Sequence, residues 1–148
     1  MEEVKYRMLS DTATEPTKGS GRAGGWDLYA DLKGEARQAI QVGETVKIGT
    51  GLSAEIPCYA FGAIYARSGL ATKSGIRPAN CVGVIDADYR GEIIIALHND
   101  GDSPFIVEHG MRIAQIIIQP YVPVKWTKAE SLSETERGEG GFGSTGTK

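Results

Sequence analysis

Three short stretches in the body of this 148-residue chain carry polar side chains that a packed β protein does not need. The first, residues 66–71 (ARSGLA), places Arg67 and Ser68 beside Gly69, directly after a predicted strand. A guanidinium, a hydroxyl and a glycine backbone side by side suit the oxygens of a di- or triphosphate. The alternative is an ordinary cap, in which Ser68 caps a short helix and Arg67 is solvated.

The other two stretches carry a carboxylate and an amide. In residues 83–92 (GVIDADYRGE), Asp86 stands at the end of a predicted strand, where a partly desolvated carboxylate can act as a general base. A capping role in the turn is the alternative. In residues 110–115 (GMRIAQ), Arg112 and Gln115 interrupt an apolar strand. Gln115 can hold a phosphate oxygen directly or through water, or else it lies at an edge position facing solvent.

The last twelve residues, 137–148 (RGEGGFGSTGTK), are too rich in glycine to pack a core. Their backbone N–H groups can converge on an anion, and Arg137, Ser144 and Thr145 add further donors. The spacing of Gly138 and Gly143 is that of the P-loop glycines. However, Ser144 replaces the lysine and no helix can follow, which excludes a Walker-type site. A solvated terminus is the alternative, but the aromatic residue within the segment, Phe142, argues against a pure spacer.

Composition narrows the class of protein. The chain suits one domain with a real core, since 41% of its residues are hydrophobic. A net charge of −3 and a pI near 5.4 disfavour a broad nucleic-acid-binding surface. No apolar run approaches the length of a membrane span, and the acidic start differs from a signal peptide. We therefore expect a soluble, intracellular protein, in the cytoplasm or in the interior of a host cell, that binds a small phosphorylated molecule.

The two cysteines, Cys58 and Cys81, form neither a CxxC pair nor a cluster with His98 or His109. This spacing disfavours a zinc site, and the expected state of both residues is a buried, reduced thiol.

Alternating apolar residues and turn signals predict strands over most of the body. One face of residues 44–56 carries Val46, Ile48 and Leu52, and glycines interrupt the run. A short helix is expected near residues 70–74. The pattern predicts an all-β fold, a β-sandwich or jelly roll, with a flexible C-terminal tail. The predicted strands are residues 4–9, 26–30, 44–56, 61–66, 81–85, 91–98, 105–107, 112–119 and 122–126.

In this order, the stretches resemble the five motifs of the trimeric dUTP pyrophosphatases (dUTPases) over nearly the whole chain. The motifs are residues 23–30 (AGGWDLYA), 66–71, 83–92 preceded by Asn80, 110–115 and 137–146. The resemblance implies a dUTP diphosphatase that converts dUTP to dUMP and pyrophosphate. Such an enzyme limits uracil incorporation into DNA and supplies dUMP for dTMP synthesis. It further implies a β domain over residues 1–136 and a tail over residues 137–148 that closes over the active site.

The resemblance also assigns roles to the base and sugar contacts. The third motif, with Gly83, Val84 and Ile85, would form a hairpin whose main chain accepts uracil, and Asn80 would contact the base. Such a site leaves polar groups unpaired when cytosine enters. Tyr89 would lie under the deoxyribose and exclude a 2′-hydroxyl sterically.

By the same resemblance, Asp86 is the general base that activates water for attack on the α-phosphorus. Mg²⁺ would be held by substrate phosphates and water, without a direct protein ligand, and Asp27 would support this region from behind. The phosphate chain would contact Arg67, Ser68, Gly69 and Gln115. In the tail, Phe142 would stack on uracil, while the terminal phosphates would engage Arg137, Gly143, Ser144 and Thr145.

The family implies a homotrimer with active sites between subunits, for which the isoleucine-rich residues 93–95 and 116–118 are candidates to bury around the threefold axis. Two alternatives remain open from the residues alone. One is a dCTP deaminase of the same fold, and the other is a catalytically silent, dUTPase-like regulator that binds nucleotide. Zinc-dependent base deaminases are excluded because neither H-x-E nor P-C-x-x-C occurs.

Overall fold

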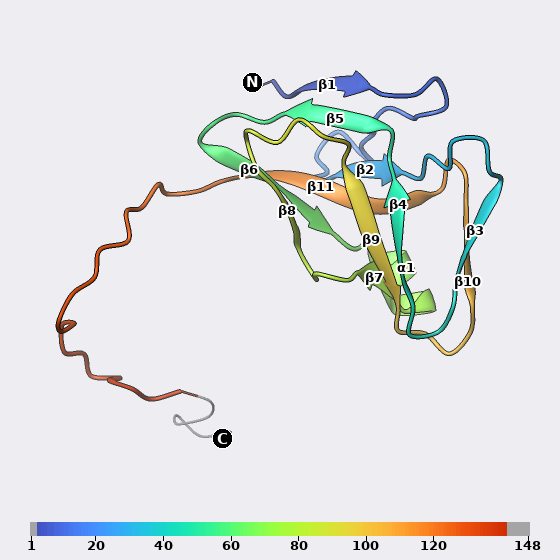
Figure 1. The fold of residues 1–148 in the computed structure, drawn as a ribbon. Helices are drawn as coiled ribbons and strands as arrows, with labels where there is room; N and C mark the ends of the chain where they lie inside the picture. Colours follow the sequence, from blue (N-terminus) through green and yellow to red (C-terminus); the bar gives the residue numbers. More distant parts are fainter. Residues whose placement is uncertain (1–2, 142–148) are drawn as a thin grey trace.

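Residues 3–141 are described by the computed structural model, and within them the chain forms eleven strands and one short helix (Figure 1). The elements are β1 (Lys5–Met8), β2 (Trp26–Tyr29), β3 (Arg37–Ile40), β4 (Thr45–Gly49), β5 (Leu52–Glu55), β6 (Ala60–Tyr65), α1 (Ser68–Ser74), β7 (Ile76–Pro78), β8 (Gly83–Ile85), β9 (Ile94–Asn99), β10 (Phe105–Glu108) and β11 (Arg112–Pro120).

The strands pair antiparallel in four small sheets. The largest has the order β2-β11-β6-β8, and a second has the order β4-β9-β7. The pairs β1-β5 and β10-β3 complete the body. Neighbouring strands are mostly far apart in the sequence, as expected of a β-sandwich, and the all-β, jelly-roll prediction is confirmed.

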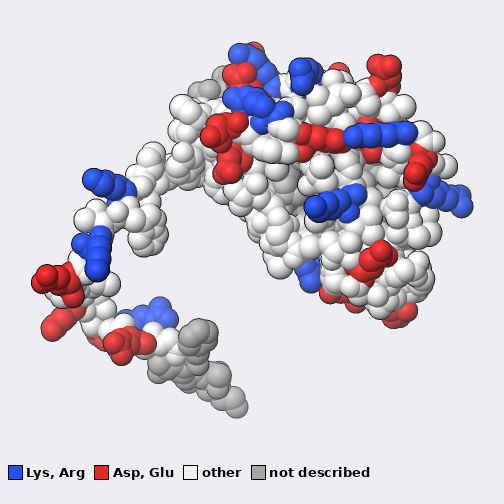
Figure 2. Space-filling model, in the orientation of Figure 1, with Lys and Arg blue, Asp and Glu red and all other residues white. Residues whose placement is uncertain are grey.

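After β11 the chain leaves the body and makes no further strand or helix up to residue 141 (Figure 1). Both basic and acidic side chains occur along this segment (Figure 2). The strand predicted for residues 122–126 is therefore wrong. Val122 and Trp126 are 79% and 95% exposed, because this part of the chain has left the sheets that could pair with it, and Pro123 offers no N–H for pairing.

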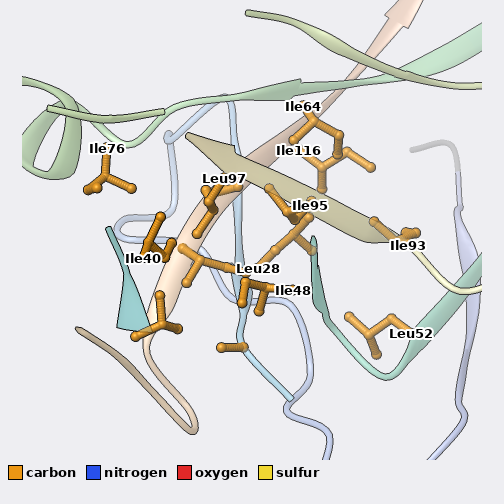
Figure 3. Packing of buried hydrophobic residues seen from close by; sticks show 14 residues of the cluster. Leu28, Ile40, Ile48, Leu52, Ile64, Ile76, Ile93, Ile95, Leu97 and Ile116 are labelled. Atoms are coloured by element: carbon orange, nitrogen blue, oxygen red, sulfur yellow. The ribbon is translucent and has the colours of Figure 1, made fainter. Parts of the chain in front are cut away.

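Aliphatic side chains from both main sheets form the core between them (Figure 3). In β11, Ala114 and Ile116 face inward against Leu28 of β2 and Ile64 of β6. In β9, Ile95 and Leu97 alternate with the outward-facing Ile94. The prediction that residues 93–95 and 116–118 bury around a threefold axis is thus corrected for Ile93, Ile95 and Ile116. All three are already buried within one protomer.

The glycines in residues 44–56 end one strand and begin another. Gly51 has φ of +64°, and a Cβ there would lie 2.5 Å from the Cβ of Ala13. The predicted strand therefore splits into β4 and β5, because only glycine fits this turn. The sequence reasoning missed β3 and β7, which carry little alternation of their own.

The predicted helix near residues 70–74 is present and begins two residues earlier, at Ser68. It ends at Gly75, whose φ of 65° is left-handed and whose N–H is donated to the carbonyl of Leu70. Both cysteines are free and exposed, so the prediction of buried thiols is wrong. Cys58 follows Pro57 at the end of a strand, and Cys81 lies in a tight turn with φ of 62°. Residues 3–141 contain no helix that is long and apolar enough to cross a membrane.

A buried carboxylate anchors the N-terminal segment to the loop after β2. Asp31 is 3% exposed and accepts hydrogen bonds from the hydroxyls of Ser10 and Thr12 and from the N–H of Lys33. The Nδ1 of His109, 3.8 Å away, accepts the N–H of Leu32 and so donates nothing to Asp31. Burial raises the pKa of Asp31, but the three hydrogen bonds outweigh burial and hold the pKa below its usual range.

Asp31→Asn is expected to destabilise the protein most at neutral pH. Because the folded-state pKa is lowered, the stability from the carboxylate is present above the ordinary pKa of about 4 and is lost as the pH falls through the folded value. The free energy of unfolding in urea should therefore be lower for the variant than for the wild type at pH 7, and this difference should shrink as the pH falls to 3. Asp102→Asn, at an exposed position, is the control. A difference that stays constant across this range would contradict the assignment.

Candidate active site

The outer face of the β2-β11-β6 sheet carries polar side chains from three of the sequence motifs. The register sets Gln115 of β11 directly opposite Asp27 of β2 on one side and Tyr65 of β6 on the other. Residues opposite each other on adjacent strands point to the same face, whereas Leu28 and Ala114 point to the core. The sheet therefore brings motifs that are far apart in the sequence to one surface.

Two arginines share the carboxylate of Asp27. Arg67 Nε is 2.8 Å from Oδ1, and Arg67 Nη2 is 3.4 Å from Oδ2. Arg112 Nη1 donates to the same Oδ2 over 3.3 Å. The Asp27 side chain is only 12% exposed, and the two guanidinium groups and one carboxylate leave one net positive charge. This surface therefore favours an anion over a bare cation.

Gln115 is held inside this surface. Its Nε2 donates to the carbonyl of Ala66 over 2.9 Å. Its Oε1 lies against Gly25, where a Cβ would come within 2.4 Å. The side chain thus joins the first and second motifs through their backbones, and its other N–H can still be donated to a ligand.

Ser68 and Gly69 begin α1 and are exposed. The cap of this helix is Arg67, not Ser68, and the Arg67 guanidinium, which has no acceptor for a capping hydrogen bond, pairs with Asp27 instead. The alternative reading, in which Ser68 caps the helix and Arg67 is solvated, is therefore wrong. The Ser68 hydroxyl, the Gly69 backbone and the Arg67 guanidinium are neighbours at the end of β6.

At the other side of the same sheet, β8 is an edge strand, and among residues 3–141 its one strand partner is β6. Its second edge therefore presents backbone N–H and C=O groups without a strand partner. Beside it lies a hollow of about 130 Å³, lined by β8, by Asn80 and by residues 94–96 of β9. The expected hairpin is accordingly open: its two arms belong to different sheets and frame the hollow between them.

Asp86 follows β8 directly and is exposed. Its carbonyl accepts the N–H of Tyr89 over 3.1 Å, which closes a turn. The Tyr89 ring lies over Gly91, where a Cβ would be 2.4 Å from the Tyr89 hydroxyl, and that hydroxyl donates to the carbonyl of Glu92. Ser53 Oγ donates to the carbonyl of Arg90 and ties the turn to β5. The turn that follows β8 thus holds a carboxylate and an aromatic ring.

The tail is described only in part. Arg137 Nε donates to the carbonyl of Gly140 over 2.9 Å within a local turn. Phe142, Gly143, Ser144 and Thr145 lie outside the described residues.

The predicted site residues form two groups within one chain. Arg67, Asp27 and Gln115 are joined by hydrogen bonds to one another or to adjacent backbone, whereas Asn80 lines the hollow. Asp86 and Tyr89 lie in the turn directly after β8. Over residues 3–141, no hydrogen bond or ion pair joins the two groups. Within the same range, no three His, Cys, Asp or Glu side chains cluster as a metal site would require.

The sequence reasoning missed the pairing of both arginines with Asp27. Arg112 was noticed only as an interruption of an apolar strand, because nothing local links it to a residue 85 positions earlier.

Comparisons with known proteins agree on one family. The dUTPase family model matches residues 11–146. A deoxyuridine 5'-triphosphate nucleotidohydrolase of Desulfitobacterium hafniense is 52% identical over 125 residues, which cover 84% of this chain and 82% of that protein. One of the same name from Rickettsia bellii is 47% identical and covers 97% of this chain and 95% of that protein.

Two solved structures with the same fold are phage enzymes. The dUTPase of Staphylococcus bacteriophage 80alpha, solved with dUpNHpp, superposes with a TM-score of 0.88 at 26% identity and covers 99% of both chains. A mutant dUTPase from phage phi11 of S. aureus, described with a structural Mg(II) ion, has a TM-score of 0.79 at 19% identity. It covers 90% of this chain and all of that one.

Proposed function

Since the chain belongs to the dUTPase family and is a dUTP diphosphatase, we propose that it hydrolyses dUTP to dUMP and pyrophosphate with Asp86 as the general base. The observation that carries this proposal is the continuity of β8: its free edge lines the hollow, and the next residue along the chain is Asp86. A uracil ring bound at that edge therefore brings the sugar and phosphates of its nucleotide close to the Asp86 carboxylate.

Uracil recognition rests on the main chain of β8. The edge of Gly83, Val84 and Ile85 offers alternating donors and acceptors that can match the O4 and N3–H of uracil, and Asn80 adds a side-chain amide. Gly83 leaves little room for a larger residue, since a Cβ there would lie 3.0 Å from Ile64 and 3.4 Å from the Asn80 amide. Cytosine reverses the donor and acceptor pattern and leaves buried groups unpaired.

Tyr89 excludes ribonucleotides by occupying the space of the 2′-hydroxyl. Its ring is held by its contact with Gly91 and by the hydrogen bond to Glu92. A ring fixed in this way cannot easily move aside for a bulkier sugar.

Tyr89→Ala is expected to raise kcat/KM for UTP relative to dUTP by about tenfold or more, because the variant removes the steric barrier. The measurement is pyrophosphate release from each nucleotide. Tyr89→Phe, which keeps the ring and loses only the hydroxyl bonded to Glu92, should discriminate as the wild type does. An unchanged UTP to dUTP ratio in Tyr89→Ala would remove Tyr89 from this role.

Asp86 orients and deprotonates the water that attacks the α-phosphorus, and the phosphate chain is bound by Arg67, Ser68, Gly69 and Gln115. Arg67 suits this role because Asp27 fixes two of its nitrogens and leaves its other N–H groups for phosphate oxygens.

The described side chains around Asp27 offer no free carboxylate to hold Mg²⁺ directly. They fit a Mg²⁺ that arrives bound to the substrate. The carboxylate of Asp27 is taken up by two arginines, so it supports the site by holding them and not by direct metal ligation. When bound to the triphosphate, Mg²⁺ would offset negative charge on the phosphate oxygens.

The tail, residues 137–148, closes over the bound nucleotide. Phe142 stacks on uracil, while Arg137, Gly143, Ser144 and Thr145 contact the terminal phosphates. In support, residues 122–139 are exposed and form no strand or helix, so this length of chain can reach a site elsewhere.

The enzyme is a homotrimer whose active sites lie between subunits. The support is the separation of the two groups of site residues, since Asp86 and Tyr89 make no polar contact with Arg67 or Gln115 of their own chain among the described residues. A second copy can supply the missing half. In the cell interior, the reaction limits uracil incorporation into DNA and provides dUMP for dTMP synthesis.

A further inference from the structure

A β-bulge in β11 interrupts the regular pairing with β2. Ile116, Gln115 and Ala114 pair in register with Trp26, Asp27 and Leu28, but the next pair is Arg112 with Tyr29. One residue of β11, Ile113, is therefore extra. Ile113 and Ala114 are consecutive and both fully buried, whereas residues of a regular strand alternate between faces.

The bulge decides on which face Arg112 lies. In an unbroken strand, Arg112 would lie on the face opposite to Gln115, which is the core face. Because the bulge takes up one position, Arg112 lies on the outer face with Gln115 and Asp27, and its Nη1 is 3.3 Å from Asp27 Oδ2. Bulges are common next to active sites, where they redirect a side chain in this way.

The pair with Asp27 does not use up the guanidinium of Arg112. Its side chain is 50% exposed, and within residues 3–141 its one side-chain hydrogen bond is the one to Asp27. An arginine carries five N–H donors, so donors remain for another anion. Asp27 already accepts two hydrogen bonds from Arg67, and a single carboxylate cannot neutralise both cations. An ion pair at this exposure adds little stability, so the pair with Asp27 does not by itself explain an arginine at this position. The bulge buries Ile113 in the core and at the same time sets Arg112 on the outer face.

We propose that Arg112 is a second arginine that binds the triphosphate chain of the substrate, presented beside Arg67 by the bulge and by Asp27. This inference rests on the proposed function, because it takes Arg67 as a phosphate-binding residue. The two guanidinium groups face one anion from adjacent positions, as planar forks that match phosphate oxygens.

The test compares two ligands that differ only in phosphate. For purified Arg112→Gln, the dissociation constant of the non-hydrolysable imido analogue of dUTP should rise about tenfold or more, the usual cost of a lost hydrogen bond between charged groups. The inhibition constant of deoxyuridine, which has no phosphate, should stay within about twofold of wild type. Arg37→Gln is the matched control, since Arg37 is also exposed and ion-paired, with Glu108 at 3.2 Å on the β10-β3 pair. It should bind both ligands as the wild type does.

Three outcomes overturn the inference: analogue affinity unchanged in Arg112→Gln, deoxyuridine affinity lowered as much as analogue affinity, or an equal loss in Arg37→Gln. Arg67→Gln separates this failure from failure of the proposed function. If Arg67→Gln weakens the analogue and Arg112→Gln does not, only the role of Arg112 is wrong. If neither does, the phosphate site itself is wrong. If Arg112→Gln does not fold, Arg112→Lys replaces it in the same measurements, judged by the same outcomes. Lysine keeps the positive charge but lacks the planar guanidinium.

Discussion

Asp86→Asn is expected to lower kcat for dUTP about 100- to 10,000-fold, the range typical of a lost general base. The amide has nearly the shape of the carboxylate but cannot take a proton from the attacking water. Because Asp86 is exposed and follows the edge strand β8, the change should leave the fold intact. The measurement is the rate of pyrophosphate release at saturating dUTP, together with the dissociation constant of the imido analogue, which should stay near the wild-type value.

Asp88→Asn is the matched control, since Asp88 is exposed in the same turn and has no assigned role. It should keep turnover within a few-fold of wild type. If Asp86→Asn kept full turnover, or if Asp88→Asn lost as much, Asp86 would not be the base.

Removal of residues 137–148 is expected to lower kcat/KM for dUTP about 100-fold or more, because it deletes the Arg137 contact and the stacking of Phe142 together. The fold should survive, since residues 122–139 are exposed and extend away from the sheets (Figure 1). Steady-state kinetics, with circular dichroism and size-exclusion chromatography, test both halves of this expectation.

Lys128→Ala, an exposed position earlier in the same extended segment, should leave activity unchanged and serves as the control. Full activity of the truncated protein would refute closure by the tail. A truncated protein that no longer assembled would show instead that the tail has a structural role.

The strands with strong alternation could be predicted from sequence, because burial of one face leaves a period of two. β4 and β9, along which buried and less buried residues alternate, are examples. β3 and β7 could not, since each is short and takes its stability from distant partners, β10 and β9. For residues 122–126, the alternation Val122, Val124 predicted a strand, but a strand also needs a neighbour, and this segment has none within the described chain.

For the site, the motifs indicated which residues to consider but not how they are arranged. Asp27 can hold Arg67 because β2 and β6 pair with opposite edges of β11. The two residues are 40 positions apart in the sequence, so no local pattern reveals the contact. The placement of Arg112 depends on a single extra residue in β11, which has no local sequence signal. The hollow beside β8 likewise arises because the arms of the expected hairpin join different sheets.

The central claim, that the site selects and hydrolyses dUTP, is tested most directly by pyrophosphate release from dUTP, UTP, dCTP and dTTP in parallel with Mg²⁺, with ammonia followed in the dCTP sample. We expect rapid release from dUTP and little from the other three. Comparable release from UTP or dTTP, ammonia from dCTP, or no release from any of the four would contradict it.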